Sequence, residues 1–377
     1  MIHVITPEYP PQQGGVANYT RQVARELARA GEVVHVWCPA DGAGDCADAF
    51  VTHPALGNFR RLDLARTDRL LDTFAAPRRL LVQWVPHGYG FKGMNVSFCW
   101  WLWKRAAAGD AVEVMVHEPF VAFEASRIKQ NIVGIVQRVM TAVLLRAARK
   151  VWIAIPAWEP SWKPYALGKR ISFRWLPVPS SLSAADTAAV KAVRARFAVN
   201  PHRNVGHFGT FGQLVTSLLD DTLPAIAARC PDVHFLLIGA GGHEYCKELV
   251  ARHPVLDGHV SATGSLDFEQ LASHLAACDV LVQPYPDGIS SRRTTAMAGL
   301  ALGVPVVTTR GHLTEPFWET SGSVRLSDVD DSQRMAEQVV SLLASSGERE
   351  QLAEMGSVFY DRYFDVRHTV DALRAAG

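Results

Sequence analysis

The sequence predicts an α/β protein with two doubly wound, Rossmann-like domains. Short apolar runs rich in β-branched residues alternate with longer helical patterns along most of the chain, which is typical of βαβ units and parallel sheets. A stretch rich in proline and serine, Arg174–Leu182, interrupts the alternation and indicates a domain boundary. A chain of 377 residues with 48% hydrophobic residues is long enough to build two separate cores.

The first half of the chain predicts an N-terminal domain over residues 1–178. Helices are expected over Tyr19–Ala30 and Ile128–Ala148, among others. Strands are expected at the short apolar runs, near Met1–Thr6, Val33–Cys38, Leu80–Val85, Glu113–His117 and Val151–Ile155.

The second half predicts a C-terminal domain over residues 179–377. Its strands are expected near Asn204–Phe208, His234–Ile238, Val260–Thr263, Val280–Gln283 and Val304–Thr308. The closing segment, Arg349–Ala376, is expected to be helical. Four aromatic residues lie in it, and the last helix, about 358–377, is therefore available to pack back on the N-terminal domain.

Composition and charge exclude several classes of protein. A formal net charge of +1 gives no whole-protein field that would attract nucleic acid. The six cysteines have no metal-like spacing and are expected to be reduced thiols. The N-terminus enters a strand directly, and no run of about 18 uninterrupted apolar residues occurs, so neither a signal peptide nor a spanning helix is predicted. We expect a cytoplasmic protein with no metal site.

Residues that follow strands are the candidate ligand contacts, because ligands of open α/β sheets bind at the carboxyl ends of the strands. Gly14 and Gly15 follow the first strand and precede a helix that carries Asn18. Amides at a helix N-terminus favour an anion or a sugar hydroxyl, and two glycines let a ligand approach the backbone. A plain glycine turn is the alternative.

Histidines also follow strands in the first half. His117 and Glu118 end one apolar strand, and His87, Tyr89 and Lys92 follow another among glycines. A histidine at such a position can hydrogen-bond a sugar hydroxyl or move a proton. A structural role is the alternative for each of these five residues.

Glycine loops follow two strands of the second half. Thr210 and Gly212 lie in the loop Gly209–Gly212, and a second loop carries Gly239 and Gly241. Neither loop has the GxGxxG spacing with an acidic partner, so hydride transfer is not favoured. Thr210 and Gly212 remain candidate contacts to a donor.

The sequence DGISSRRTT, residues 287–295, concentrates hydroxyl and guanidinium groups at the start of a predicted helix, Thr295–Leu302. Unpaired amides and the dipole at a helix N-terminus favour negative charge, and guanidinium groups suit phosphate oxygens. A capped helix with solvated arginines is the alternative. We predict a diphosphate site made by Ser290, Ser291, Arg292, Arg293, Thr294 and Thr295.

These motifs together resemble the GT-B-fold retaining glycosyltransferases of family four. The resemblance rests on GGVANYT after the first strand, HE at a strand end, FGTFG in the second half, and DGISSRRTT running into LALGVPVVTT. It implies two Rossmann-like domains facing a central cleft, with a nucleotide-sugar donor held by the C-terminal domain and a hydroxyl-bearing acceptor held by the N-terminal domain. The acceptor would be a glycan, a lipid-linked glycan or a small molecule. No cofactor and no catalytic metal are implied.

Carried over residue by residue, the resemblance assigns Gly14 and Gly15 to the donor phosphates and acceptor, and His117 to the transferred sugar. The family usually has two glutamates separated by seven residues, but Ser290 and Ala298 stand at these positions, and Gln213 replaces a usual arginine. We therefore expect Arg292 and Arg293 to supply the missing positive charge. Asp287 is expected to take over a hydroxyl contact.

The predicted function is retaining, metal-independent transfer of a hexose from a nucleoside diphosphate sugar, in bacterial glycan or natural-product glycoside synthesis. A GT-B-fold epimerase or hydrolase and a catalytically silent sugar-binding protein are the alternatives. Peripheral contact with the inner face of a membrane also stays open, because Phe98–Arg105 and Ile132–Lys150 combine apolar and basic residues. The alternative for Trp100, Trp101 and Trp103 is burial in the core.

Overall fold

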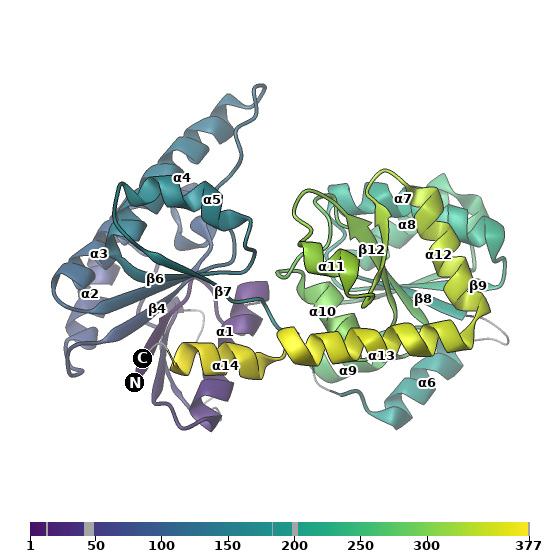
Figure 1. Cartoon of the computed structure of the whole chain (residues 1–377), viewed down its shortest axis with the longest axis horizontal. Helices are drawn as coiled ribbons and strands as arrows, with labels where there is room; N and C mark the ends of the chain where they lie inside the picture. Colours follow the sequence, from purple (N-terminus) through teal and green to yellow (C-terminus); the bar gives the residue numbers. More distant parts are fainter. Residues whose placement is uncertain (13, 41–48, 183, 198–202, 376–377) are drawn as a thin grey trace. The chain divides into compact units, whose positions relative to one another are not determined.

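The computed structural model describes residues 1–12, 14–40, 49–182, 184–197 and 203–375. Cys46 lies outside these residues. The chain forms two compact units, of which one is Met1–Val178 together with Val366–Gly377 and the other is Pro179–Asp365 (Figure 1). Each unit has its own parallel sheet covered by helices, so each is described by itself below.

The N-terminal domain contains a seven-stranded parallel sheet in the order β3-β2-β1-β4-β5-β6-β7. Its central strands are almost entirely buried, as expected for a sheet covered on both faces. The strands are β1 (Ile2–Ile5), β2 (Val34–Trp37), β3 (Val51–His53), β4 (Arg79–Trp84), β5 (Ala111–Val116), β6 (Ala148–Ile153) and β7 (Ser172–Trp175).

Helices cover both faces of this sheet. The last helix of the chain packs against α1 on one face, while α2, α3 and α4 cover the other (Figure 1). The helices are α1 (Gly15–Arg29), α2 (Arg61–Leu71), α3 (Val96–Ala107), α4 (Ile128–Ala147), α5 (Trp158–Trp162) and α14 (Val366–Arg374), with short 3-10 turns η2 (Pro86–Tyr89), η3 (Phe91–Gly93) and η4 (Lys163–Ala166).

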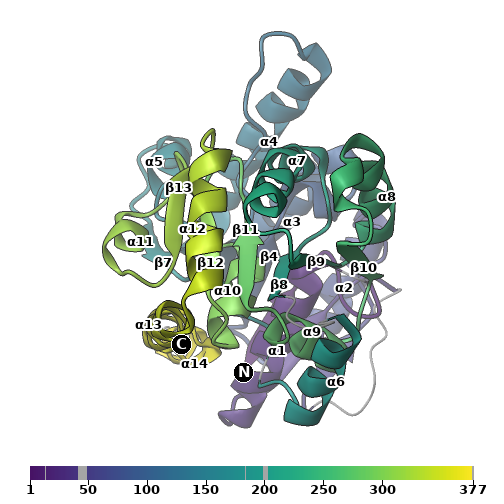
Figure 2. The ribbon, with the colours of Figure 1, turned by 90° about the vertical axis from the view of Figure 1, so that its right-hand side faces the viewer.

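The C-terminal domain contains a six-stranded parallel sheet in the order β10-β9-β8-β11-β12-β13. Figure 2 shows β11 in the middle of this sheet. The strands are β8 (Arg203–Phe208), β9 (Val233–Ile238), β10 (Val260–Gly264), β11 (Val280–Gln283), β12 (Val306–Arg310) and β13 (Arg325–Asp328).

The core of the C-terminal domain lies between the sheet and α7, α8 and α12, whose apolar side chains form one buried cluster with those of the strands. On the other face α10 packs close to the sheet, because Gly299 leaves room for Leu281 and Val306. The helices are α6 (Thr187–Phe197), α7 (Gln213–Arg229), α8 (Gly242–Arg252), α9 (Phe268–Ala276), α10 (Thr294–Ala301), α11 (Pro316–Thr320), α12 (Ser332–Ala344) and α13 (Ser346–Tyr363), with the 3-10 turn η5 (Pro254–Leu256).

The fold differs from the expectation in three strands and one helix. Strands β3, β7 and β13 were not predicted, because they are short edge or near-edge strands with polar residues rather than apolar runs. The closing helix is divided at Phe364 and Asp365, so that α13 belongs to the second unit and α14 to the first. The division follows the unit boundary.

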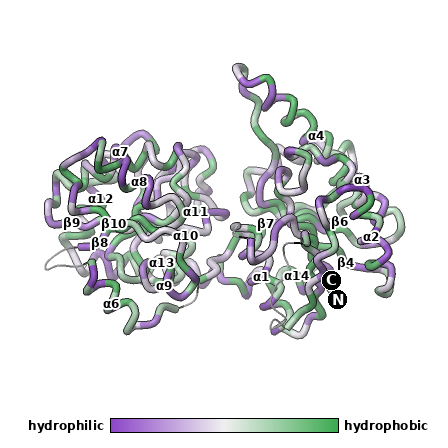
Figure 3. The backbone as a smooth tube through the Cα atoms, turned by 180° about the vertical axis from the view of Figure 1, so that it is seen from behind, coloured by the Kyte–Doolittle hydropathy of each residue, from purple (hydrophilic) through white to green (hydrophobic). Residues whose placement is uncertain are grey.

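Among the described residues, α4 is the one helix long and apolar enough to cross a bilayer, with a mean hydropathy of 1.2. A single such helix does not by itself indicate a span, because core helices of soluble proteins meet the same criterion. In this structure α4 packs against α3. Figure 3 shows that much of α4 is hydrophobic in composition.

Candidate functional site

Each sheet has a switch point, where consecutive crossovers run in opposite directions and leave a crevice at the carboxyl ends of two neighbouring strands. In the C-terminal domain the switch point lies between β8 and β11, and in the N-terminal domain it lies between β1 and β4. Loops that follow these four strands contain most of the residues singled out in the sequence. The carboxyl ends of the strands at these two switch points are therefore the candidate ligand sites.

In the C-terminal domain, the loop after β11 is fixed by close approach of two glycines. Gly288 has a φ of +85°, and a Cβ built on it would lie 2.2 Å from Gly311 N. A Cβ on Gly311 would lie 2.6 Å from Asp287 O, so neither position has room for a side chain. Hydrogen bonds from Ile289 N to Thr309 O and from Leu313 N to Asp287 O hold the two loops together. The loop therefore has a defined conformation.

Arg292 and Arg293 both form ion pairs with Asp287, which lies at the start of the same loop. The Arg292 guanidinium lies 2.7 Å from Asp287 Oδ2, and that of Arg293 contacts Oδ1. Arg293 also lies over the ring of Tyr285, at 4.4 Å from the ring centroid. The three charged side chains are only 16 to 24% exposed. Two positive charges thus share one carboxylate in a partly buried site.

The hydroxyl groups of this loop are mostly engaged within the domain. The amide and hydroxyl of Ser291 both donate to Glu315, and the hydroxyls of Thr295 and Tyr285 lie 2.7 Å apart. Burial raises the pKa of Tyr285 to about 12, so its phenol stays neutral at pH 7. Ser291 and Thr295, which were predicted to contact a phosphate, therefore already have hydrogen-bond partners in this conformation.

Ser290 and Thr294 differ from Ser291 and Thr295 in their hydrogen bonds. The Ser290 hydroxyl is fully buried and has no hydrogen-bond partner among the described residues. The Thr294 amide donates to Arg292 O in the tight turn that begins α10. Asp287 was expected to contact a sugar hydroxyl, whereas the structure pairs it with the two arginines.

Glu315 is a residue that the sequence analysis missed. It is 6% exposed, accepts from Ser291, and accepts from Trp318 Nε1 at 2.9 Å. Burial raises the pKa of its carboxyl, and the hydrogen bonds from Ser291 oppose that shift. Glu315 follows β12 and lies 24 residues from Ser291, so no local spacing could have revealed the contact. It anchors the loop that carries the arginines.

Thr210 and Gly212 lie in the loop after β8, as the sequence predicted. Both are exposed, and Gly212 O accepts the first amides of α7 from Val215 and Thr216. Between them Phe211 has a φ of +54° and packs against His207 and Tyr245. A non-glycine residue in this region is strained, and such strain is most common at functional sites.

In the N-terminal domain, Glu8 occupies the helix terminus assigned to a phosphate. Its Oε1 accepts from the amides of Val16 and Ala17, each at 3.0 Å, and a Cβ on Gly14 would collide with the same carboxylate. The expectation of open amides after Gly15 is therefore wrong for this conformation. An anion could reach them only by displacing Glu8.

Asn18 and His117 lie near this helix start. Asn18 is half-buried in α1, where its backbone amide donates to Gly14 O. His117 is 8% exposed, with Nε2 2.7 Å from Gln83 Oε1 and its ring in a T-shaped contact with the Tyr19 ring, at 4.7 Å between centroids. Burial lowers the pKa of His117 to about 3, so the imidazole is neutral at pH 7. It can hydrogen-bond a ligand, but it is not a source of protons at neutral pH.

Tyr89 was expected to contact a ligand, but the structure places it in the core. Its side chain is fully buried, its hydroxyl donates to Gln83 O at 2.6 Å, and its ring stacks on Phe98. Tyr89 therefore belongs to the core and not to an acceptor site. By contrast, His87 and Glu118 are exposed and come together, with 3.3 Å between His87 Nδ1 and Glu118 Oε2.

A cavity of about 750 Å³ lies at the switch point of the N-terminal sheet. Polar lining is supplied by Gln12, Asn58 and Arg60, and Phe91 adds an exposed ring. Lys92 follows Phe91 and was expected to contact the acceptor. It is exposed and has a φ of +55°. Phe59 and Phe91, both lining residues, also have positive φ, at 56° and 50°. Such a cluster of strained backbone conformations is typical of a ligand site. Gln12, Asn58 and Arg60, which line the same cavity, are further residues that the sequence analysis missed.

No group of three or more His, Cys, Asp or Glu side chains that could hold a metal ion occurs among the described residues. The positive charge at the C-terminal switch point comes from Arg292 and Arg293.

Comparison with known proteins agrees with this geometry. Residues 202–345 match the family model described as glycosyl transferases group 1. Over 352 residues, which are 91% of this chain and 84% of the relative, the chain is 24% identical to a phosphatidyl-myo-inositol mannosyltransferase of Mycolicibacterium smegmatis. The family match confirms the resemblance that the motifs predicted.

Solved structures share the fold. Sucrose-phosphate synthase from Thermosynechococcus elongatus has a TM-score of 0.75 at 18% identity, covering 100% of this chain and 97% of that one. HepE of Anabaena, in complex with UDP and glucose, has a TM-score of 0.67 at 18% identity, covering 100% and 98%. The GT-B fold predicted from the sequence is thereby confirmed.

Proposed function

We propose that this chain, which has a GT-B fold and a group 1 glycosyl transferase pattern in its C-terminal domain, is a retaining, metal-independent glycosyltransferase. It would transfer a hexose from a nucleoside diphosphate sugar to an acceptor hydroxyl, in bacterial glycan or natural-product glycoside synthesis. The family match supports sugar transfer as the class of reaction. The retaining and metal-independent mechanism, the hexose and the biosynthetic context are our proposal.

One observation carries the proposal for the donor: two adjacent guanidinium groups lie at the C-terminal switch point. Arg292 and Arg293 share Asp287, so the three side chains carry a net charge of +1 at neutral pH. Guanidinium forks match phosphate oxygens in geometry and charge. A diphosphate would replace Asp287 as their partner. The site could then bind the negatively charged diphosphate of the donor without a metal ion.

The proposed chemistry needs stabilisation of the leaving group more than a strong base. As the bond between the sugar C1 and the diphosphate oxygen breaks, the electron pair stays with the diphosphate, where Arg292 and Arg293 balance the developing charge. The acceptor oxygen bonds to C1 on the same face, and its proton passes to the leaving phosphate oxygen. No side-chain nucleophile is required for this route.

The cavity of the N-terminal domain is the proposed acceptor site. Its polar groups, Gln12, Asn58 and Arg60, offer hydrogen-bond donors and acceptors to hydroxyl groups, and Phe91 offers a ring face. His87, Glu118 and Lys92 would extend this surface. His117, neutral and hydrogen-bonded to Gln83, would orient a hydroxyl and not move a proton at pH 7.

Binding of a donor panel tests the function. Calorimetry with UDP-, GDP- and dTDP-sugars should show saturable binding of at least one donor, and HepE, whose structure contains UDP and glucose, makes UDP-sugars the first choice. Product analysis by NMR with donor alone separates a transferase from an epimerase or hydrolase, because only the latter two would consume donor without acceptor. No binding of any donor would favour the silent sugar-binding alternative.

We also propose that the N-terminal domain contacts a membrane from its cytoplasmic side. Four apolar residues of α4 lie on one stripe of the helix and are 49 to 74% exposed: Ile128, Ile132, Ile135 and Val139. The helix has three basic residues and no acidic one. An apolar stripe with basic flanks is typical of helices at anionic lipid surfaces.

Flotation with anionic vesicles tests this contact. The protein should float with vesicles that contain phosphatidylglycerol and less so with phosphatidylcholine alone, because basic residues add electrostatic attraction to apolar burial. An Ile132→Ser/Ile135→Ser variant should float poorly. Protein that stays in solution with every vesicle would contradict the proposal.

A further inference from the structure

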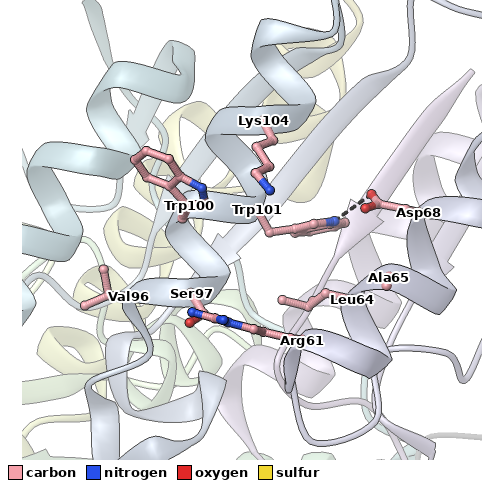
Figure 4. A pocket seen from close by; sticks show the side chains of 9 residues that line it. All are labelled: Arg61, Leu64, Ala65, Asp68, Val96, Ser97, Trp100, Trp101 and Lys104. Carbon is pink, nitrogen blue, oxygen red and sulfur yellow. Dashed lines mark hydrogen bonds between the residues drawn. The ribbon is translucent and has the colours of Figure 1, made fainter.

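A groove between α2 and α3 lies outside both switch points. Its volume is about 520 Å³, within the range of small-molecule sites. Figure 4 shows that α2 contributes one wall, with Arg61, Leu64 and Asp68, and that α3 contributes the other. The residues assigned to the donor or the acceptor do not line it.

The floor of the groove is apolar and rigid. Trp101 and Leu64 are 5% and 3% exposed, so they belong to the core and present only one face to the groove. The Trp101 indole donates to Asp68 Oδ1 at 2.6 Å, which fixes the ring (Figure 4). Trp100 is 49% exposed and forms a side wall. An apolar segment of a ligand would therefore meet a preformed surface.

Two basic side chains line this apolar floor. Figure 4 shows Lys104 on one side of Trp101 and Arg61 on the other. Asp68, the acidic member of the nine lining residues, already accepts from Trp101 and lies 3.3 Å from Arg105 Nη1. Its carboxylate is therefore already engaged by Trp101 and Arg105, and the two basic side chains outnumber it among the lining residues.

The surface beside the groove continues the same combination. Trp103, at 4.6 Å from Trp100 between ring centroids, is 37% exposed, and Leu62 of α2 is 85% exposed. Helix α3 has no acidic residue. Tryptophan and basic residues together are typical of the boundary between apolar lipid and water.

We propose that this groove binds one anionic phospholipid molecule. Its phosphate would meet the side chains of Arg61 and Lys104, which reach the groove from opposite sides of Trp101, and the first part of an acyl chain would lie along Trp100 and Leu64. The proposal deepens the membrane contact of the proposed function and is independent of sugar transfer. A sugar or nucleotide fits less well, because Ser97 is the one uncharged polar side chain among the nine described lining residues.

Binding of a monomeric short-chain lipid tests the proposal without a membrane. Dihexanoyl phosphatidylglycerol, used below its critical micelle concentration, should bind the full chain saturably with one site by calorimetry. An exposed pair between a basic side chain and a single lipid phosphate contributes at most about fivefold in affinity. An Arg61→Gln/Lys104→Gln variant should therefore bind up to about 25-fold more weakly, and Trp100→Ala should also weaken binding.

A matched control separates this site from general charge attraction. An Arg66→Gln/Arg69→Gln variant removes the same charge from exposed positions of α2 that do not line the groove, and it should bind within about twofold of the unchanged protein. Equal loss in the two variants, or no saturable binding of the short-chain lipid, would overturn the proposal. Vesicle flotation in the absence of short-chain binding would leave the membrane contact standing and remove only this groove. Donor binding should be unchanged in both variants.

Discussion

An Arg292→Ala/Arg293→Ala variant is expected to bind a nucleoside diphosphate sugar about 100-fold or more weakly, or not measurably. Each charge-assisted hydrogen bond to a phosphate contributes about 1.5 to 3 kcal/mol, and the variant removes the positive charge of the loop. The effect should be largest in kcat/KM for transfer, because the charge on the diphosphate grows as the sugar leaves. Calorimetry with the donor, followed by initial rates, measures both quantities.

The ion pairs with Asp287 require a control for folding. Removal of both arginines leaves Asp287, which is 16% exposed, without its partners, and an unpaired carboxylate there would destabilise the loop. A triple variant that adds Asp287→Asn removes this unpaired charge, so it should recover thermal stability but not donor binding. An Arg310→Gln variant removes an exposed arginine at the end of β12 and should bind donor normally. Normal donor binding by the triple variant would contradict the assigned role.

Much of the fold follows from local patterns in the sequence. The buried strands β1, β4, β8, β9 and β11 coincide with apolar runs, because strands covered on both faces need apolar side chains at successive positions. The edge strand β13, with the sequence RLSD, has no such pattern and forms because it pairs with β12. An edge strand is stabilised by hydrogen bonds with its neighbour, so its own sequence need not have an apolar pattern that predicts it.

The candidate sites follow from the sequence only in part. Residues after strands could be placed at the carboxyl edge of a sheet, and Arg292 and Thr210 lie there. The carboxylates that contact these loops could not be predicted. Glu8 accepts from a helix that starts beyond a glycine loop, and Asp287 folds back within its own loop onto Arg292. Tyr89 was assigned to a ligand because of its position after a strand, but the burial of its ring depends on Phe98.

Glu315 shows how a contact between two loops can determine the arginine site. The carboxylate accepts from the amide and hydroxyl of Ser291 and from Trp318 Nε1, and all three residues are buried. Ser291 immediately precedes Arg292, so a change at Glu315 acts on the guanidinium groups through the backbone. Glu315 is a positioning residue in this account and does not touch the donor.

A Glu315→Ala variant is therefore expected to lose about 3 kcal/mol or more of unfolding free energy, because three buried donors would lack an acceptor and each costs about 1 to 3 kcal/mol. Glu315→Gln keeps one acceptor oxygen and should lose less. Glu319→Ala, an exposed carboxylate on the same short helix α11, is the matched control and should change stability by less than about 0.5 kcal/mol. Urea unfolding measures these differences, and donor binding should fall in the same order. A Glu315→Ala protein as stable as the Glu319→Ala control would show that Glu315 does not hold the loop, and that the Gly288–Gly311 approach and the backbone hydrogen bonds between the loops suffice.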